Sequence, residues 1–182
     1  MEHYFVAVQS QRLPATNEKV RVSRVELKRL GLAEFVRCDE LLSGCELFQG
    51  LPPALLEALL VLGTVRRFTP HATVYGQGDS SRSIFWVVRG EAALQVAAGI
   101  QVAEVGRVPR GEVFGECAAL GANGALRESS ARAREELDAA EFPAEAFLAL
   151  AEKAPRLLSH LHAVRSRRRA AHDEMLAFLN RW

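Results

Sequence analysis

The sequence predicts an α+β fold, in which helices flank an antiparallel jelly-roll barrel (a double-stranded β-helix) of about eight strands. Three observations predict it. Short apolar or alternating runs recur at intervals of about 8–12 residues through the middle of the chain. Glycine and proline separate these runs, and apolar residues with helical spacing lie on both sides of them. The order of helices, strands and helices is typical of an α+β domain with one barrel at its centre.

The amino-terminal part of the chain predicts an arm followed by helices. The apolar stripe over 22–42 has helical spacing. A second, short helix is expected to start near Pro52, because proline is favoured in a first helical turn, and to end at Gly63. We therefore divide the chain into an amino-terminal arm and helix over 1–44 and a barrel domain over 45–182.

The predicted strands are short. They lie at 64–68, 73–75, 84–88, 92–96 and 100–105, with a further strand pair within 131–142. Trp86 lies in the third of these predicted strands, 84–88. Because side chains alternate between the two faces of a strand, we expect that of Trp86 to point into the core.

The carboxy-terminal part of the barrel domain predicts a short helix over 143–151 and a long helix over 155–181. Along the long helix, one stripe of residues steps by four and three: Leu157, Leu161, Val164, Arg168, Ala171, Met175, Phe178 and Trp182. This is the spacing of a coiled-coil seam, with Arg168 as its single charged interruption. Two interpretations stay open, because the stripe can join two copies in a homodimer or pack back on the barrel.

Composition and charge exclude several classes of protein. The 182 residues include 23 basic and 22 acidic side chains, a net charge of +1, so net charge gives no sign of a strongly basic nucleic-acid binder. No apolar run reaches the roughly 18 residues of a membrane span, and the start lacks a signal peptide, so we expect a cytoplasmic protein. An odd number of cysteines, Cys38, Cys45 and Cys117, favours free thiols.

Five short motifs follow one another in the barrel domain. The two most specific are Gly111 to Glu116, which reads G-E-V-F-G-E, and Arg127 to Ala133, which reads R-E-S-S-A-R-A. The others are Leu47 to Leu51, Val74 to Asp79 and Ile84 to Gly90. Together they resemble the cyclic-nucleotide-binding domain family of catabolite activator proteins and protein kinase A regulatory subunits. The resemblance implies a regulatory module in signal transduction, with cAMP or cGMP as ligand and no enzymatic activity.

The resemblance also implies a binding site, and the chemistry of the residues agrees with it. Backbone N–H groups after a glycine turn can hold the anionic cyclic phosphate. Glu116 can accept a hydrogen bond from a ribose hydroxyl, and Arg127 can pair with the phosphate oxygens. The expected ligand-binding residues are Gly115, Glu116, Cys117, Ala118, Arg127, Ser129 and Ser130. We expect no catalytic residue, no metal site and no further cofactor.

Two departures from the family pattern leave a second function open. The segment between Glu116 and Arg127 is longer than usual, and Glu128 replaces a small residue beside the phosphate. At about 4 Å and an effective dielectric constant of about 20, a carboxylate would repel the phosphate by about 4 kcal/mol. The first hypothesis is a stand-alone module that binds a cyclic nucleotide and relays it to a partner protein through the long helix. The second is a nucleotide-free adaptor for protein interaction or assembly. Because the sequence ends at Trp182, we expect no helix-turn-helix domain.

Overall fold

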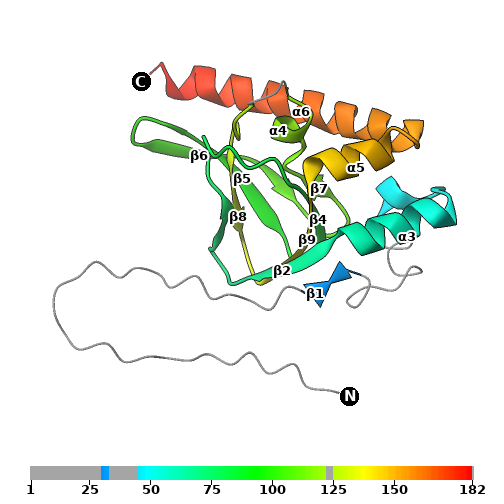
Figure 1. Cartoon of the computed structure of the whole chain (residues 1–182). Coiled ribbons are helices and arrows are strands. Elements are labelled where there is room, and N and C mark those ends of the chain that lie inside the picture. Colours follow the sequence, from blue (N-terminus) through cyan, green and yellow to red (C-terminus); the bar gives the residue numbers. More distant parts are fainter. Residues whose placement is uncertain (1–29, 33–44, 122–124, 182) are drawn as a thin grey trace, which may run out of the picture.

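Two antiparallel sheets form the barrel of this protein, for which the computed structural model describes residues 30–32, 45–121 and 125–181 (Figure 1). The five-stranded sheet has the order β1-β2-β9-β4-β7 and the four-stranded sheet the order β3-β8-β5-β6. The strands are β1 (Leu30–Gly31), β2 (Thr64–Phe68), β3 (Thr73–Tyr75), β4 (Ile84–Arg89), β5 (Ala92–Ala98), β6 (Gln101–Val108), β7 (Val113–Phe114), β8 (Ser130–Ala133) and β9 (Leu137–Phe142). This arrangement confirms the predicted α+β jelly roll.

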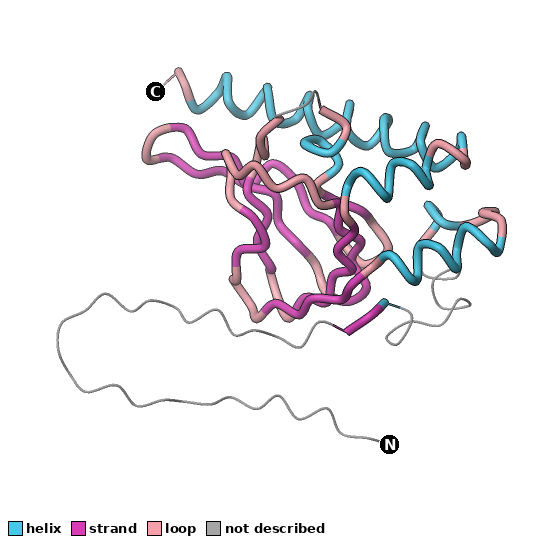
Figure 2. Tube along the Cα trace, viewed as in Figure 1, coloured by secondary structure: helices cyan, strands magenta, loops and turns pink. Residues whose placement is uncertain are grey.

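The helices gather at one end of the barrel (Figure 2). They are the 3₁₀ helix η1 (Glu46–Phe48) and the α-helices α3 (Pro53–Leu62), α4 (Glu116–Ala119), α5 (Ala144–Ala151) and α6 (Pro155–Leu179). The long helix α6 packs on β5, β6, α4, α5 and η1. No helix in the described part of the chain is long and apolar enough to cross a membrane.

Most of the predicted elements are confirmed. The strands expected at 64–68 and 73–75 have those bounds, and the short second helix ends at Gly63 as expected. The long helix ends at Leu179, two residues before the predicted bound, because Asn180 caps it. In the first half of the helix, the apolar stripe packs back on the body of the chain, which is the second of the two interpretations left open by the sequence. Leu157, Leu161 and Val164 are buried there.

The helix predicted over 22–42 is wrong at Leu30 and Gly31, whereas Leu32 is helical as predicted. Leu30 and Gly31 form strand β1 and pair with Val65 and Thr64 of β2. Leu32 is fully buried, and its N–H donates to the carbonyl of Gly63 at 2.8 Å. Pairing with a distant strand therefore overrides the local helical spacing. The rest of 22–42 lies outside the described residues. The same pairing extends the barrel into the segment predicted to be an arm.

Strand β4 separates two apolar cores, which explains its continuous apolar sequence. Ile84 and Trp86 face the helices, and the ring of Trp86 meets Phe48 of η1 edge-on at 5.3 Å. Phe85 and Val87 face the interior between the sheets. The prediction that Trp86 lies in the core is confirmed, since only 2% of it is exposed.

A buried carboxylate on the central strand β9 binds arginines from both neighbouring strands. Asp138 is 1% exposed and lies opposite Arg67 of β2 and Arg89 of β4. Arg67 donates from Nε to Oδ1 at 2.7 Å and from Nη2 to Oδ2 at 3.1 Å. The Nε of Arg89 lies 3.2 Å from Oδ2. The carboxylate thus ties three adjacent strands together at one end of the sheet.

We expect Asp138→Asn to lower the free energy of unfolding by about 2 kcal/mol, because it removes a buried charge that three arginine nitrogens bind. Urea denaturation measures the change. Glu136→Gln is the matched control, since Glu136 contacts the same arginines but is half exposed. The control should change stability by less than about 1 kcal/mol. Equal effects of the two substitutions would contradict the role assigned to Asp138.

Candidate functional site

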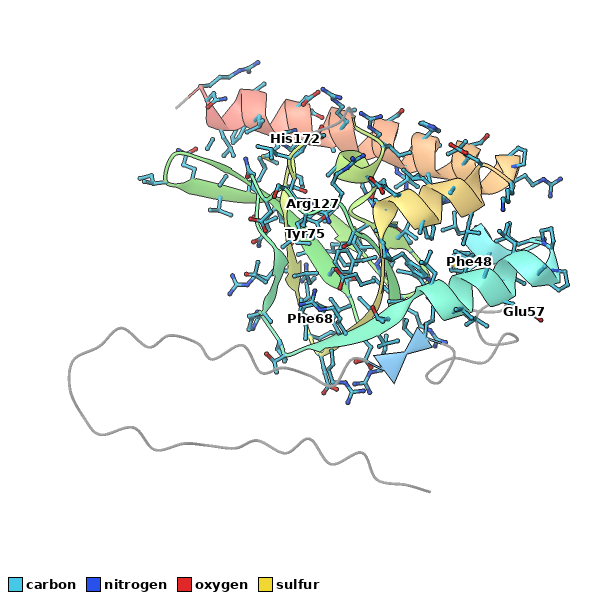
Figure 3. All side chains as sticks on the ribbon, in the orientation of Figure 1. Phe48, Glu57, Phe68, Tyr75, Arg127 and His172 are labelled. Carbon is cyan, nitrogen blue, oxygen red and sulfur yellow. The ribbon has the colours of Figure 1, made fainter. Side chains whose placement is uncertain are left out.

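The candidate site lies where the turn before α4, the segment before β8 and the middle of α6 meet. Figure 3 places Arg127 beside Tyr75 in the barrel, with His172 of α6 close to both. The structure brings six of the seven predicted ligand-binding residues to one cavity: Gly115, Glu116, Cys117, Ala118, Arg127 and Ser129. The seventh, Ser130, is not part of its lining. The Oγ of Ser130 instead accepts a hydrogen bond from the Gln77 N–H at 2.9 Å, which links the turn after β3 to the start of β8.

Arg127 is buried, with 3% of the residue exposed, and most of its hydrogen bonds go to the backbone. Nη1 donates to the Gly115 carbonyl and Nη2 to the Ser83 carbonyl, each at 2.7 Å, while Nε lies 3.3 Å from Ser81 Oγ. The guanidinium also lies 4.1 Å from the centre of the Tyr75 ring. Burial lowers the pKa of this arginine and raises the pKa of Tyr75. Arg127 therefore joins three segments around the site, rather than pairing with Glu128 on the surface.

Gly115 is required in this turn for two reasons. Its φ of +85° is a conformation that residues with a Cβ rarely adopt. A Cβ there would also lie 2.7 Å from both Arg127 Nη1 and the Ser83 carbonyl oxygen. The protein's own arginine therefore occupies the space that the absent side chain of Gly115 leaves.

The carboxylate of Glu116 is bound by the long helix. Glu116 is 1% exposed, and its Oε2 accepts a hydrogen bond from Arg168 Nη1 at 2.9 Å. The same Nη1 donates to the Val113 carbonyl at 2.6 Å, and Nη2 lies 3.3 Å from Glu112 Oε2. Arg168 therefore holds α6 against α4 and β7 at the position where the sequence predicted a ribose hydroxyl.

Helix α6 closes the cavity, which has a volume of only about 30 Å³. Two further contacts fix the helix there. His172 Nε2 lies 2.8 Å from the Glu128 carbonyl oxygen, and Arg165 donates to the Leu120 carbonyl at 2.9 Å. A cyclic mononucleotide is far larger than this space, so the residues that line the cavity, those of α6 among them, must rearrange before such a ligand can enter.

Glu128 lines the cavity and has a partner on α6. Its Oε1 lies 3.9 Å from Arg169 Nη1, and 30% of its side chain is exposed. Both the distance and the exposure make this a weak ion pair, so most of the negative charge remains beside the cavity.

Cys117 is a neutral thiol. Burial and the nearby Glu116 carboxylate raise its pKa to about 12. Its Sγ lies 3.5 Å from Glu116 Oε1. This environment does not activate Cys117 as a nucleophile.

Five residues that line the cavity were not predicted from the sequence: Tyr75, Leu94, Val105, Arg168 and His172. One signal for Arg168 was present, since it is the charged interruption of the apolar stripe along α6. A lone charge in such a stripe needs a buried partner, and Glu116 supplies it. His172 follows one turn later on the same helix.

Comparison with protein families identifies the segment that carries the site. Residues 65–154 match the family model described as cyclic nucleotide-binding domain. No curated protein sequence matches the chain.

Solved structures share the fold of this chain. The catabolite activator protein of Thermus thermophilus is 28% identical with a TM-score of 0.60, over 74% of this chain and 62% of that chain. The c-di-GMP responsive regulator CLP of Xanthomonas campestris is 21% identical with a TM-score of 0.59, over 71% and 65%. The regulatory domain of Toxoplasma gondii PKA, solved with cAMP, is 22% identical with a TM-score of 0.60, over 69% and 48%. This chain spans less than two thirds of each of these structures.

We expect Arg127→Ala to lower the free energy of unfolding by about 3 kcal/mol or more, because two buried carbonyls lose their donor. Arg132→Ala is the control, since exposed Arg132 donates to a single carbonyl, that of His71. Its cost should stay below about 1 kcal/mol. Thermal or urea unfolding compares the two, and equal stabilities would mean that Arg127 does not support the turn.

We expect Arg168→Ala to loosen α6 and to raise the alkylation rate of Cys117 by iodoacetamide about tenfold near pH 8. Loss of the arginine charge alone acts in the opposite direction, because the charge of Arg168 lowers the pKa of Cys117. A faster reaction therefore reports exposure of the thiol. Peptide mapping by mass spectrometry separates Cys117 from the other cysteines. Arg167→Ala, one position earlier on α6, should leave the rate unchanged, and no difference between the variants would count against the contact.

Proposed function

Because the chain belongs, through residues 65–154, to the cyclic nucleotide-binding domain family, we propose that it is a regulatory module that binds cAMP or cGMP beside Glu116 and Arg127. The observation that supports the proposal most is the convergence of an arginine, a carboxylate and the first turn of α4 on one cavity under α6. These groups match the phosphate and the sugar of a cyclic nucleotide.

Arg127 keeps hydrogen-bonding capacity for a phosphate. A guanidinium has five N–H groups, and three of those of Arg127 have partners among the described residues. Nη1 and Nη2 each carry one further N–H, and Arg127 lines the cavity. Its bonds to the Gly115 and Ser83 carbonyls would hold the guanidinium in place while the free N–H groups bind the ligand.

Helix α6 gives the proposed ligand a way to produce a signal. A nucleotide whose ribose hydroxyl donates a hydrogen bond to the Glu116 carboxylate competes with Arg168 for that carboxylate. Such a ligand therefore favours positions of α6 away from the site. The shift equals the difference in ligand affinity between the two positions of the helix. We propose that a partner protein or a second copy of the chain reads this position.

The carboxy-terminal half of α6 is the surface that suits such a partner. Phe178 is 55% exposed, and the neighbouring half-buried residues Met175 and Leu179 continue the apolar stripe. The tip of the β5–β6 hairpin adds Ile100 and Val102, which are also exposed. A homodimer through this surface is the partner arrangement that the stripe predicts.

The second candidate function is a nucleotide-free adaptor, and specific contacts favour it. Arg168 already satisfies Glu116, Arg127 already binds backbone carbonyls, and Glu128 adds negative charge to the cavity. In this alternative the closed cavity is the final state, and the exposed half of α6 serves assembly alone.

Calorimetric titration of the nucleotide-free protein with cAMP and with cGMP tests the proposal. A micromolar or tighter dissociation constant for either ligand supports the regulatory module. If neither the wild type nor Arg168→Ala gives a binding signal up to millimolar ligand, the proposed nucleotide binding is overturned and the adaptor function is favoured.

We further expect Glu128→Ala to tighten nucleotide binding about tenfold, since it removes a partly screened repulsion of the phosphate. Glu174→Ala, an exposed carboxylate of α6 that lines no described cavity, is the control for net charge. If both variants bind as the wild type does, Glu128 does not face the ligand.

A further inference from the structure

A second cavity, larger than the one at Glu116, lies between η1, the turn before β7 and the first half of α6. Its volume is about 350 Å³, within the range of roughly 300–1,000 Å³ that is usual for small-molecule sites. Its lining consists of Cys45, Glu46, Leu47, Arg110, Gly111, Glu112, Val113, His160, Val164 and Arg167.

Hydrogen bonds join the walls of this second cavity. The thiol of Cys45 donates to the Gly111 carbonyl at 2.6 Å, which links η1 to the turn before β7. Arg168 Nη1 donates to the Val113 carbonyl at 2.6 Å, which links β7 to α6. The cavity is therefore formed by fixed elements, which reduces the cost of ordering it around a ligand.

The floor of the second cavity is apolar and uncharged. Leu47, Val113 and Val164 are buried there. Cys45 beside them is 3% exposed, and burial raises its pKa to about 11, so that it is a neutral thiol at neutral pH. An apolar group can therefore bury surface on this floor.

Two arginines and two carboxylates lie on the rim of the second cavity. Arg110 and Arg167 are exposed and have neither a hydrogen bond nor an ion pair with any residue that the structure describes. Many other arginines, including Arg66 and Arg134, bind carboxylates. Of the two carboxylates on the rim, Glu112 lies 3.3 Å from Arg168, which also binds Glu116, so Glu112 is only partly neutralised and Glu46 and Glu112 both oppose the two arginines.

We propose that this cavity is a binding site for a small organic acid, with its apolar body on the floor and its anionic head group paired with Arg110 and Arg167. Guanidinium groups suit this role because they bind carboxylate, sulfonate or phosphate oxygens in a fork. The acidic Glu46 and Glu112 on the same rim disfavour a polyanion such as nucleic acid. The site is separate from the one at Glu116 and does not depend on nucleotide binding there.

Fluorescence titration of the full chain with 8-anilinonaphthalene-1-sulfonate, an aromatic monoanion, tests the proposal. We expect saturable binding to the wild type. Replacing both arginines, Arg110→Ala with Arg167→Ala, should raise the dissociation constant about tenfold or more, because the head group loses two charged donors. Both side chains are exposed, so the variant should unfold at the same urea concentration as the wild type.

One matched control and two further tests show whether the probe binds in the second cavity. Arg156→Ala with Arg181→Ala makes the same change of net charge at two exposed arginines outside the cavity, and should leave the dissociation constant unchanged. Val164→Phe fills the floor and should also weaken binding. The uncharged analogue N-phenyl-1-naphthylamine should bind the wild type and the Arg110→Ala, Arg167→Ala variant equally. Absence of saturable binding, or equal losses in the two double variants, would overturn the proposal.

Discussion

Glu116 carries a carboxylate that is 1% exposed, and a buried charge is tolerated only beside a buried counter-ion. Arg168 provides that counter-ion from α6, at a point some 50 residues further along the chain. The ion pair between Glu116 and Arg168 fixes where α6 crosses the barrel. It thereby fixes the residues of α6 that line both cavities. Replacing Arg168 would leave the charge of Glu116 without compensation in the interior, so the position of the helix and the chemistry of the site are linked.

Arginines have a second role in this fold, since several bind backbone carbonyls of the irregular segments around the site. Arg127 holds the turn at Gly115 and the end of the segment before β4, while Arg82 donates to Ala119 and Arg165 to Leu120. Loops have few backbone partners of their own, and a guanidinium can satisfy several carbonyls at once. The site is therefore ordered before any ligand arrives, and a ligand finds Arg127 already oriented.

The helix α6 faces two environments with different consequences for function. Its first half buries Leu157 and Leu161 in the core shared with η1 and α5, and it lines the second cavity with His160, Val164 and Arg167. Its second half covers the Glu116 site with His172 and then extends over the β5–β6 hairpin with exposed apolar residues. The proposed nucleotide at the Glu116 site would act on the half with fewer buried residues, where displacement costs least.

The sequence by itself determined most of the strands, the helices α3 and α5 and the turn at Gly115, because glycine, proline and local apolar spacing set these elements over a few residues. It also placed six residues of the site, since their motifs are contiguous in the chain. Tertiary structure decided the rest. Leu30 and Gly31 are a strand only because β2 offers a free edge, and Arg168 belongs to the site only because α6 folds back on Glu116. Likewise, the donors of Arg127 point at carbonyls, and Glu128 lies near Arg169. Such contacts join residues that are far apart in the chain, so the local spacing of residue types cannot predict them.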